Sequence, residues 1–214
     1  GRHRPAAVLP PAGQRLSWPY TALKRHVPQQ IPIYALQSPL FSGGALPDDL
    51  TELVHLYTDT ITGVAPTGPI RVLGWSFGGV LALLVAQELV RRGRDVGYVG
   101  MLDSYPHVSS GEFDREAVLA SVLSEMGFAA DVGDRLTVPE AIDLMRAHDD
   151  AIAILDDTQI AAAVENYIAA EKFTVRADYG RYDGEVFFVD AALEDDRWGV
   201  ASQAWRRYIP GCCA

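Results

Sequence analysis

A serine lies at the centre of the segment Gly74-Trp75-Ser76-Phe77-Gly78, in the spacing G-x-S-x-G. A serine hydroxyl is a poor nucleophile at neutral pH unless a base is close and amide donors face the developing oxyanion. This spacing provides such an environment when a buried strand precedes the serine and a helix follows, because Gly74 and Gly78 leave room for a sharp turn. Bare G-x-S-x-G also arises by chance. With its strand and helix, the motif predicts Ser76 as the nucleophile of an acyl-transfer reaction.

An aspartate follows the next apolar run along the chain. Asp103 comes directly after Val99-Gly100-Met101-Leu102, and the carboxyl ends of adjacent parallel strands meet where open α/β sheets bind ligands. A carboxylate at this position can orient a histidine Nδ1–H and stabilise the imidazolium. The alternative is structural, with Asp103 capping the turn at Ser104–Tyr105. The chain order of serine before aspartate favours the catalytic role.

An acyl-transfer site also needs two amide donors for the oxyanion. One is expected to be the amide of Phe77, the residue after the predicted nucleophile. The other should come from the loop after an early strand, which here is Pro10-Pro11-Ala12-Gly13. Because proline has no N–H, Ala12 is the predicted donor. An ordinary Pro/Gly turn is the alternative for this loop.

None of the five histidines lies where the chain order requires the base: His3, His26, His55, His107 and His148. We expect them to be surface or partly buried residues, with His107 nearest the site because it shares a loop with Asp103. One more strand and a histidine loop should follow the strand over Glu185–Val189, and the chain stops first. We therefore expect the catalytic histidine beyond Ala214, or an inactive relative. A truncated form of this kind should be poorly active and marginally stable.

The elements around Ser76 form a strand–helix–strand unit, with a strand over Ile70–Trp75, a helix over Phe77–Arg92 and a strand over Val96–Leu102. Gly93 is predicted as the C′ glycine of the helix. In the earlier part of the chain, we predict strands over Ala6–Leu9 and Ile31–Leu36 and helices over Leu16–Val27 and Asp48–Val64. A loop is predicted over Pro39–Pro47. The pattern indicates an α/β fold with a mostly parallel sheet.

A helical block interrupts this alternation after Pro106. Its predicted helices are Phe113–Met126, Val138–His148 and Thr158–Lys172, and the pattern then resumes with the strand over Glu185–Val189 and a helix over Val200–Tyr208. An insertion of this kind is expected over the carboxyl edge of the sheet. We therefore predict one domain, residues 1–214, with a helical lid at about residues 111–173.

Composition narrows the classes of partner. The 214 residues carry a net charge of −10, without a basic cluster that could follow a line of phosphates, so nucleic acid is not an expected partner. No apolar run reaches the roughly 18 residues of a membrane span, and no signal peptide is recognisable. The adjacent Cys212 and Cys213 predict neither a disulfide framework nor a cysteine zinc site, and a reducing cytoplasm is the expected compartment. Because the chain opens with Gly1, we expect it to be processed or cut from a longer polypeptide.

Taken together, these motifs resemble the type I thioesterase domains of nonribosomal peptide synthetases and their polyketide synthase relatives, within the α/β-hydrolase superfamily. The segments that carry the resemblance are Leu73-Gly74-Trp75-Ser76-Phe77-Gly78-Gly79, Met101-Leu102-Asp103-Ser104-Tyr105-Pro106, and Pro11-Ala12-Gly13 followed by Ser17-Trp18 and Tyr20. Gln14 stands where the family's oxyanion loop usually has a second glycine. Tyr34-Ala35-Leu36-Gln37, Tyr182-Asp183-Gly184 and the late Trp205-x-x-Tyr208 are also similar to the family.

The resemblance implies a mechanism and a partner. An upstream carrier domain delivers an acyl or peptidyl chain as a thioester on phosphopantetheine, Ser76 attacks the carbonyl, and the Phe77 and Ala12 amides hold the oxyanion. Water or a nucleophile within the chain then releases the product by hydrolysis or cyclisation, without a metal or a directly bound cofactor. The alternatives are a small-molecule serine esterase, a stand-alone editing thioesterase, or an inactive truncated relative that lacks the catalytic histidine.

Overall fold

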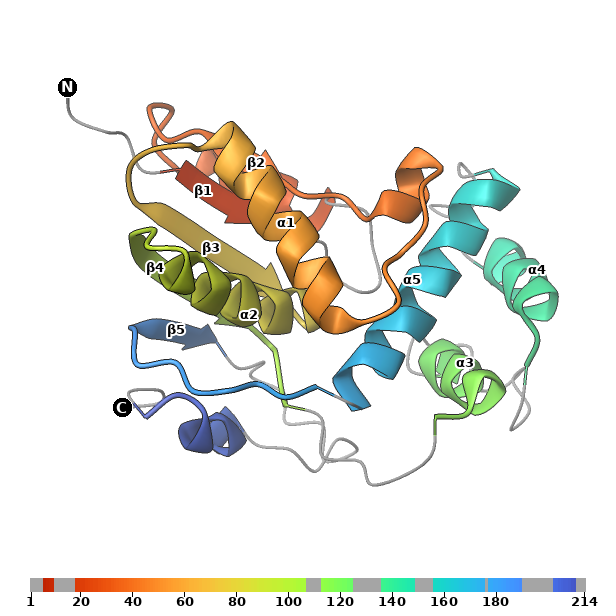
Figure 1. Cartoon of the computed structure of the whole chain (residues 1–214). Coiled ribbons are helices and arrows are strands. Elements are labelled where there is room, and N and C mark those ends of the chain that lie inside the picture. Colours follow the sequence, from red (N-terminus) through yellow and green to blue (C-terminus); the bar gives the residue numbers. More distant parts are fainter. Residues whose placement is uncertain are drawn as a thin grey trace.

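In the part of the chain that the structure describes, five parallel strands form the sheet on which the site is built (Figure 1), in the order β2-β1-β3-β4-β5. Their bounds are β1 Ala6–Leu9, β2 Ile33–Ala35, β3 Ile70–Trp75, β4 Val96–Leu102 and β5 Val186–Val189. The central strands β3 and β4 bury their apolar side chains completely at Ile70, Val72, Val99 and Met101. Burial on both faces requires helices or other cover on each side of the sheet. The predicted parallel α/β sheet is confirmed.

The computed structural model describes residues 6–9, 18–106, 113–124, 136–148, 156–175, 177–189 and 202–210. In these ranges, no helix combines the length and the apolar character needed to cross a bilayer.

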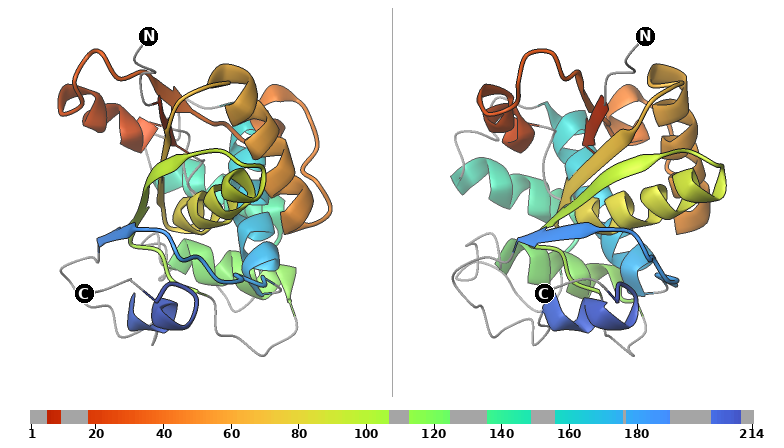
Figure 2. Two further views of the ribbon diagram at one scale, coloured as in Figure 1. Left: turned by 60° about the vertical axis from the view of Figure 1, so that its left-hand side comes forward. Right: turned by 90° about the vertical axis from the view of Figure 1, so that its left-hand side faces the viewer.

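Helices α1 (Leu50–Val64) and α2 (Phe77–Arg91) lie together on one side of the sheet (Figure 2), while the 3₁₀ helix η1 (Trp18–Arg25) lies on the other. α1 begins where the Asp49 carboxylate accepts a hydrogen bond from the Glu52 amide at 2.8 Å. α2 ends before Gly93, whose φ of +75° has the left-handed conformation of a C′ glycine. Most of α2 is buried because it packs against β3, β4 and α1.

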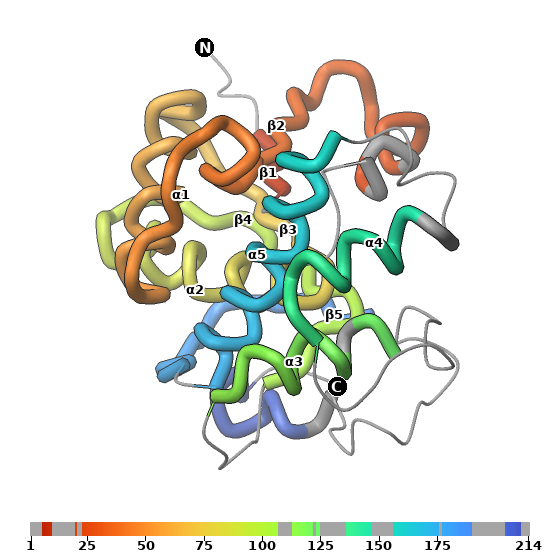
Figure 3. Tube along the Cα trace, turned by 90° about the vertical axis from the view of Figure 1, so that its right-hand side faces the viewer, coloured from red at the N-terminus to blue at the C-terminus, as the bar shows by residue number. Residues whose placement is uncertain are grey.

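Helices α3 (Arg115–Leu123), α4 (Val138–His148) and α5 (Asp157–Val175) pack against one another at the carboxyl ends of the strands (Figures 1 and 3). They enclose an apolar cluster of their own, which includes Leu119, Leu123, Ala141, Met145, Ile160, Val164 and Ile168. A second, larger cluster fills the space between the sheet, α1 and α2. The sheet and the helical block thus have separate cores, and Phe173 near the end of α5 belongs to the larger one.

Apart from shifts of a few residues at element ends, the structure differs from the expected elements in three 3₁₀ segments and one strand. η1 and η5 (Ser202–Arg207) are 3₁₀ helices within the ranges where ordinary helices were expected, and η2 (Pro39–Ser42) lies in a predicted loop. Apolar spacing over so few residues does not separate i+3 from i+4 hydrogen bonding. β2 is shorter than predicted because the Ile31 amide donates to Pro28 O in a turn and Pro32 has no amide hydrogen.

Candidate active site

Ser76 occupies a strained turn between the end of β3 and the start of α2. Its φ is 54° and its ψ is −127°, a combination that L-residues rarely adopt and that costs on the order of 1–3 kcal/mol. The Ser76 amide donates to Leu102 O at 2.9 Å, and the Ser76 carbonyl accepts from the Gly79 amide at 2.9 Å. Ser76 stands at the N-cap position of α2, where its hydroxyl makes no capping hydrogen bond. The hydroxyl is therefore not committed to the helix that follows it.

Gly74 is required by the closeness of this turn. A Cβ built at Gly74 would lie 1.9 Å from the carbonyl oxygen of Gly78 and 2.5 Å from the Gly79 nitrogen. Both neighbours are backbone atoms of the first turn of α2, so they cannot move aside without displacing the helix. The predicted need for a small residue at Gly74 therefore has a direct steric cause.

Asp103 follows β4 in the position that corresponds to Ser76 after β3. Trp75 and Leu102 are register partners in the parallel pair β3–β4, so the next residue of each strand lies at the same edge. Asp103 also has a positive φ, 46°, and its amide donates to Val189 O at 2.7 Å. Two strained residues side by side at the carboxyl edge of a sheet are a common mark of a functional site.

Tyr105 holds one oxygen of the Asp103 carboxylate. The Tyr105 hydroxyl donates to Asp103 Oδ1 at 3.0 Å, and the Tyr105 ring packs edge-on against Phe188 of β5 with centroids 6.0 Å apart. A carboxylate has two oxygens and several lone pairs, so this hydrogen bond leaves Oδ2 able to accept from another donor.

Tyr20 supports the other side of the strand end. Its hydroxyl accepts a hydrogen bond from the Trp75 amide at 2.9 Å. Because β1 pairs with β3 only as far as Val72, no β1 residue reaches this amide. Burial raises the pKa of Tyr20 to about 12, so the phenol stays protonated at neutral pH. Tyr20 comes from η1, the element that follows the predicted oxyanion loop in the chain.

Phe77 begins α2, so its amide has no carbonyl of an earlier helical turn to pair with. Its ring stacks on Phe173 of α5, with centroids 6.4 Å apart and planes inclined by 23°. The residue after the predicted nucleophile is therefore in direct contact with the helical block. The N-terminus of a helix also favours developing negative charge.

Ser104 was expected only as part of a turn beside Asp103, yet it joins three parts of the site. It is completely buried, and its hydroxyl donates to Ser76 O at 2.7 Å and lies 3.1 Å from Leu102 O. Its carbonyl accepts from the indole Nε1 of Trp205 at 2.7 Å. Sequence reasoning missed this role because the contacts join residues far apart in the chain; a small polar residue directly after a strand-end aspartate was the available signal.

Two histidines have described side chains, and neither is brought to Ser76 by a described contact. His55 Nε2 lies 3.6 Å from Glu88 Oε1, and Glu88 is about 16 Å along α2 from Phe77 at 1.5 Å per residue. His26 follows η1 at the surface. His3, His107, Ala12 and the rest of the predicted oxyanion loop lie outside the described residues, as does the His148 side chain.

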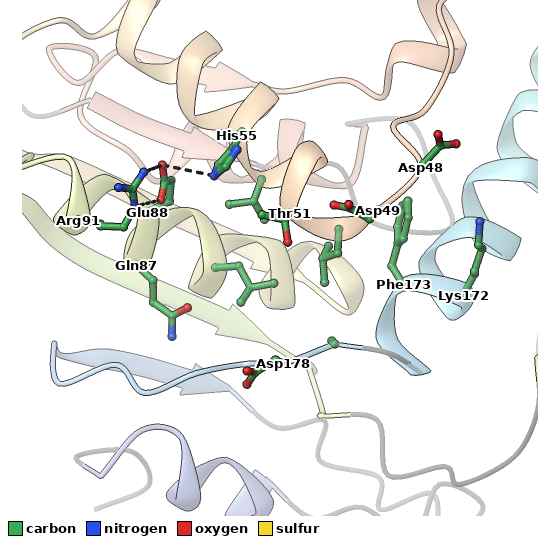
Figure 4. A pocket seen from close by; sticks show the side chains of 14 residues that line it. Asp48, Asp49, Thr51, His55, Gln87, Glu88, Arg91, Lys172, Phe173 and Asp178 are labelled. Atoms are coloured by element: carbon green, nitrogen blue, oxygen red, sulfur yellow. Dashed lines mark hydrogen bonds and ion pairs between the residues drawn. The ribbon is translucent and has the colours of Figure 1, made fainter.

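A hollow of about 540 Å³ opens between α1, the second half of α2 and the end of α5 (Figure 4). Glu88, Arg91, Lys172 and Asp178 contribute charged groups of both signs to its wall, and His55 contributes an imidazole. Neither Ser76 nor Asp103 lines it. In the described ranges, no three His, Cys, Asp or Glu side chains gather in a group that could hold a metal ion.

The parallel sheet, the strained serine between β3 and α2, and the helical block at the carboxyl ends together define an α/β-hydrolase fold. The family model described as "Thioesterase domain" matches residues 4–204. The chain belongs to this thioesterase domain family.

Its curated relatives are much longer than the chain. A dimodular nonribosomal peptide synthase of Bacillus subtilis (strain 168) is 30% identical over 99% of this chain, which spans 9% of that protein. A probable non-canonical nonribosomal peptide synthetase, CymA of Salinispora arenicola, is 27% identical over 97% of the chain, which spans 3% of that protein. The chain thus corresponds to less than a tenth of these multidomain relatives.

Solved thioesterase domains share the fold. The NocB thioesterase domain in covalent complex with a fluorophosphonate nocardicin G analogue superposes with a TM-score of 0.68 at 23% identity, covering 96% of this chain and 82% of that one. The Vlm2 thioesterase domain bound with a dodecadepsipeptide gives a TM-score of 0.71 at 19% identity, covering 98% and 83%. The chain is therefore a thioesterase domain related to those of nonribosomal peptide synthetases.

Proposed function

We propose that this domain releases an acyl or peptidyl chain from the phosphopantetheine thioester of a carrier domain, by hydrolysis or cyclisation through an acyl-enzyme on Ser76. The observation that carries the proposal is the geometry at Ser76. A serine with a φ of 54° stands between β3 and α2, and Asp103 follows the register-paired end of β4. Membership of the thioesterase family supports the reaction class, and the nonribosomal peptide synthetase relatives support the carrier-bound substrate.

The proposed chemistry has two halves. The Ser76 hydroxyl adds to the thioester carbonyl as a base takes its proton, and the tetrahedral intermediate collapses by breaking the C–S bond so that the thiol leaves with a proton. Water, or a hydroxyl or amine of the acyl chain itself, then adds to the Ser76 ester and releases the acid or the ring. The Phe77 amide is the proposed donor to the oxyanion in both halves, with Ala12 as its partner.

Asp103 would orient the base, with Tyr105 holding Oδ1 so that Oδ2 meets the imidazole. Because His55 pairs with Glu88 on the far part of α2, it is a poor choice for this base. The helices α3–α5 would act as a lid that shapes the acyl pocket and limits the entry of water, and so biases hydrolysis against cyclisation.

The first test is covalent labelling. A fluorophosphonate probe is expected to add one phosphonyl group to the full-length protein, on the peptide that contains Ser76, and the Ser76→Ala variant should remain unlabelled. Intact-protein mass spectrometry followed by peptide mapping measures both. Labelling that persists in Ser76→Ala would contradict the nucleophile assignment, and a wild-type protein that never reacts would support an inactive relative.

Substrate competition separates the thioesterase from a small-molecule esterase. We expect hydrolysis of an acyl group on a phosphopantetheinylated carrier protein to exceed hydrolysis of the same acyl group as a simple oxygen ester at equal concentration. Liquid chromatography of the released acid measures both rates, with Ser76→Ala as the blank. A preference for the oxygen ester would favour the esterase.

A further inference from the structure

Ser104 directly follows one strained residue of the site, Asp103, and its hydroxyl donates to the backbone of the other, Ser76. Its hydroxyl oxygen is 2.7 Å from Ser76 O and 3.1 Å from Leu102 O. A serine hydroxyl has a single proton to donate, and the shorter distance directs it to Ser76. Ser104 is fully buried, and without its hydroxyl the Ser76 carbonyl keeps the Gly79 amide as its described donor.

The packing around Ser104 leaves no freedom for its hydroxyl. A Cβ built at Gly79 would lie 1.9 Å from Ser104 Oγ and 2.7 Å from Ser104 Cβ. The second glycine after Phe77 is therefore needed so that the side chain of Ser104 can reach the turn. This contact gives Gly79 a role in the site that the G-x-S-x-G spacing alone does not include.

The backbone of Ser104 is fixed from a third direction. Trp205 is fully buried in η5, donates its indole N–H to Ser104 O at 2.7 Å, and packs edge-on against Tyr179 at 5.1 Å. The turn that follows Asp103 is thus held by a rigid aromatic group from late in the chain. The carbonyl of Ser104 is thus held by Trp205, and the hydroxyl of Ser104 in turn holds the carbonyl of Ser76.

We propose that Ser104 is a positioning residue for the nucleophile: its hydroxyl holds the carbonyl of Ser76 and so keeps the strained turn in the conformation that exposes the Ser76 side chain. The inference rests on the proposed role of Ser76. A residue at a φ of 54° relaxes unless its surroundings hold it, and the Ser104 hydrogen bond joins this turn to the turn of Asp103. Removing the hydroxyl misplaces the nucleophile without touching the substrate.

The chain offers a matched control. Thr58 is also fully buried, and its hydroxyl donates to a backbone carbonyl, Val54 O, at the same distance of 2.7 Å, but within α1. Ser104→Ala and Thr58→Val each remove one buried hydroxyl-to-carbonyl hydrogen bond. Both should lower the urea midpoint of unfolding. A shift of the nucleophile should follow from Ser104→Ala alone.

The first measurement is the second-order rate of fluorophosphonate labelling at Ser76, on protein that is shown to be folded. We expect Ser104→Ala to react about tenfold to a hundredfold more slowly than wild type, since small displacements of reacting groups have effects of this size. Thr58→Val should react at the wild-type rate. Equal rates for all three proteins, or an equal loss in both variants, would overturn the proposal.

The second measurement does not depend on reactivity. Hydrogen–deuterium exchange by mass spectrometry should show faster exchange in Ser104→Ala at the peptide covering residues 74–80, and Thr58→Val should leave that peptide unchanged. If wild type is not labelled at all, the proposed function fails, and exchange alone decides whether Ser104 holds the turn. Unchanged exchange in this peptide would overturn the positioning role. Ser104→Cys, whose sulfur is a weaker donor and is larger than the hydroxyl oxygen, replaces the alanine variant if that variant does not fold, and should change both readouts in the same direction.

Discussion

Gly74 shows how little space the turn at Ser76 leaves at the scale of single residues. The atoms that a methyl group would meet are the Gly78 carbonyl and the Gly79 nitrogen, both in the backbone of α2. Ser76, in turn, is held by hydrogen bonds to Leu102 and from Gly79 and Ser104. A conformation that is unfavourable by itself is thus fixed by several contacts at once, which is how strained residues persist in folded proteins.

Gly74→Ala is expected to destabilise the protein by about 3 kcal/mol or more, because overpacking against backbone forces the helix away from the strand. Gly63→Ala is the matched control, since a Cβ at Gly63 meets nothing within 4 Å in the exposed part of α1. It should be neutral or stabilising by about 0.5–1 kcal/mol, as alanine is the better helix former. Urea unfolding followed by circular dichroism compares the two. A Gly74→Ala protein as stable as Gly63→Ala would contradict the steric argument.

At the scale of elements, α5 connects the two apolar cores of the molecule. Its N-terminal part contributes Ile160 to the cluster of the helical block, and its C-terminal part places Phe173 against Phe77. The helix that would form the main part of the lid therefore contacts the residue whose amide is the proposed oxyanion donor.

We expect Phe173→Ala to lower stability by about 3–5 kcal/mol and also to slow the labelling of Ser76, because the ring that supports Phe77 is lost. Ile160→Ala should lower stability by about 2–5 kcal/mol and leave the labelling rate of the folded protein unchanged. The test compares the labelling rates of the two variants, each measured under conditions well below its unfolding midpoint, where the protein is folded. If Ile160→Ala slows labelling as much as Phe173→Ala, the contact between Phe173 and Phe77 has no specific role.

The elements that the sequence predicted best are those with strong local signals. β1, β3, β4 and α4 have the expected bounds, because their apolar runs are bounded by turn residues or by changes in period. The 3₁₀ helices η1 and η5 carry Tyr20 and Trp205, and their contacts with Trp75 and Ser104 depend on packing between distant segments. Ser76 and Asp103 could be predicted as candidates from motif and order. The hydrogen bonds that hold them could not, because no local pattern encodes which distant hydroxyl or indole reaches a given backbone atom.

For the molecule as a whole, a charged cluster joins α1 to α2 on the side away from Ser76. The carboxylate of Glu88 is only 8% exposed and receives hydrogen bonds from Arg91 at 2.6 Å and from Arg92 at 2.6 Å. Arg92 also pairs with Asp59 of α1. The hydrogen bonds from Arg91, and then those from Arg92, lower the pKa of Glu88 from 4.5 to about 2.

The depressed pKa gives the stability a defined dependence on pH. The ionised Glu88 stabilises the folded state fully above pH 4.5, and this contribution is lost as the pH falls toward 2. Glu88→Gln should lower the free energy of unfolding by about 1–2 kcal/mol at pH 7, a modest effect because both arginines are near solvent. The difference from wild type should shrink as the pH is lowered from 5 to 2. Urea titrations of both proteins between pH 5 and pH 2 measure this difference in the free energy of unfolding. A difference that stays constant would contradict the assigned pKa.

The hydrogen bond from Trp205 to Ser104 has a consequence for the order in which the protein acquires its shape during synthesis. β3, α2 and β4 are complete once residue 102 has been added, and domains begin to fold from the N-terminus as the ribosome extends them. The indole that secures the turn after Asp103 is made about a hundred residues later, which takes roughly 5–20 s at 5–20 residues per second. A Ser76 turn that has already folded in that interval lacks the hydrogen bond from Trp205. A growing polypeptide therefore gains a fully constrained Ser76 turn only when the segment that contains Trp205 has emerged and docked.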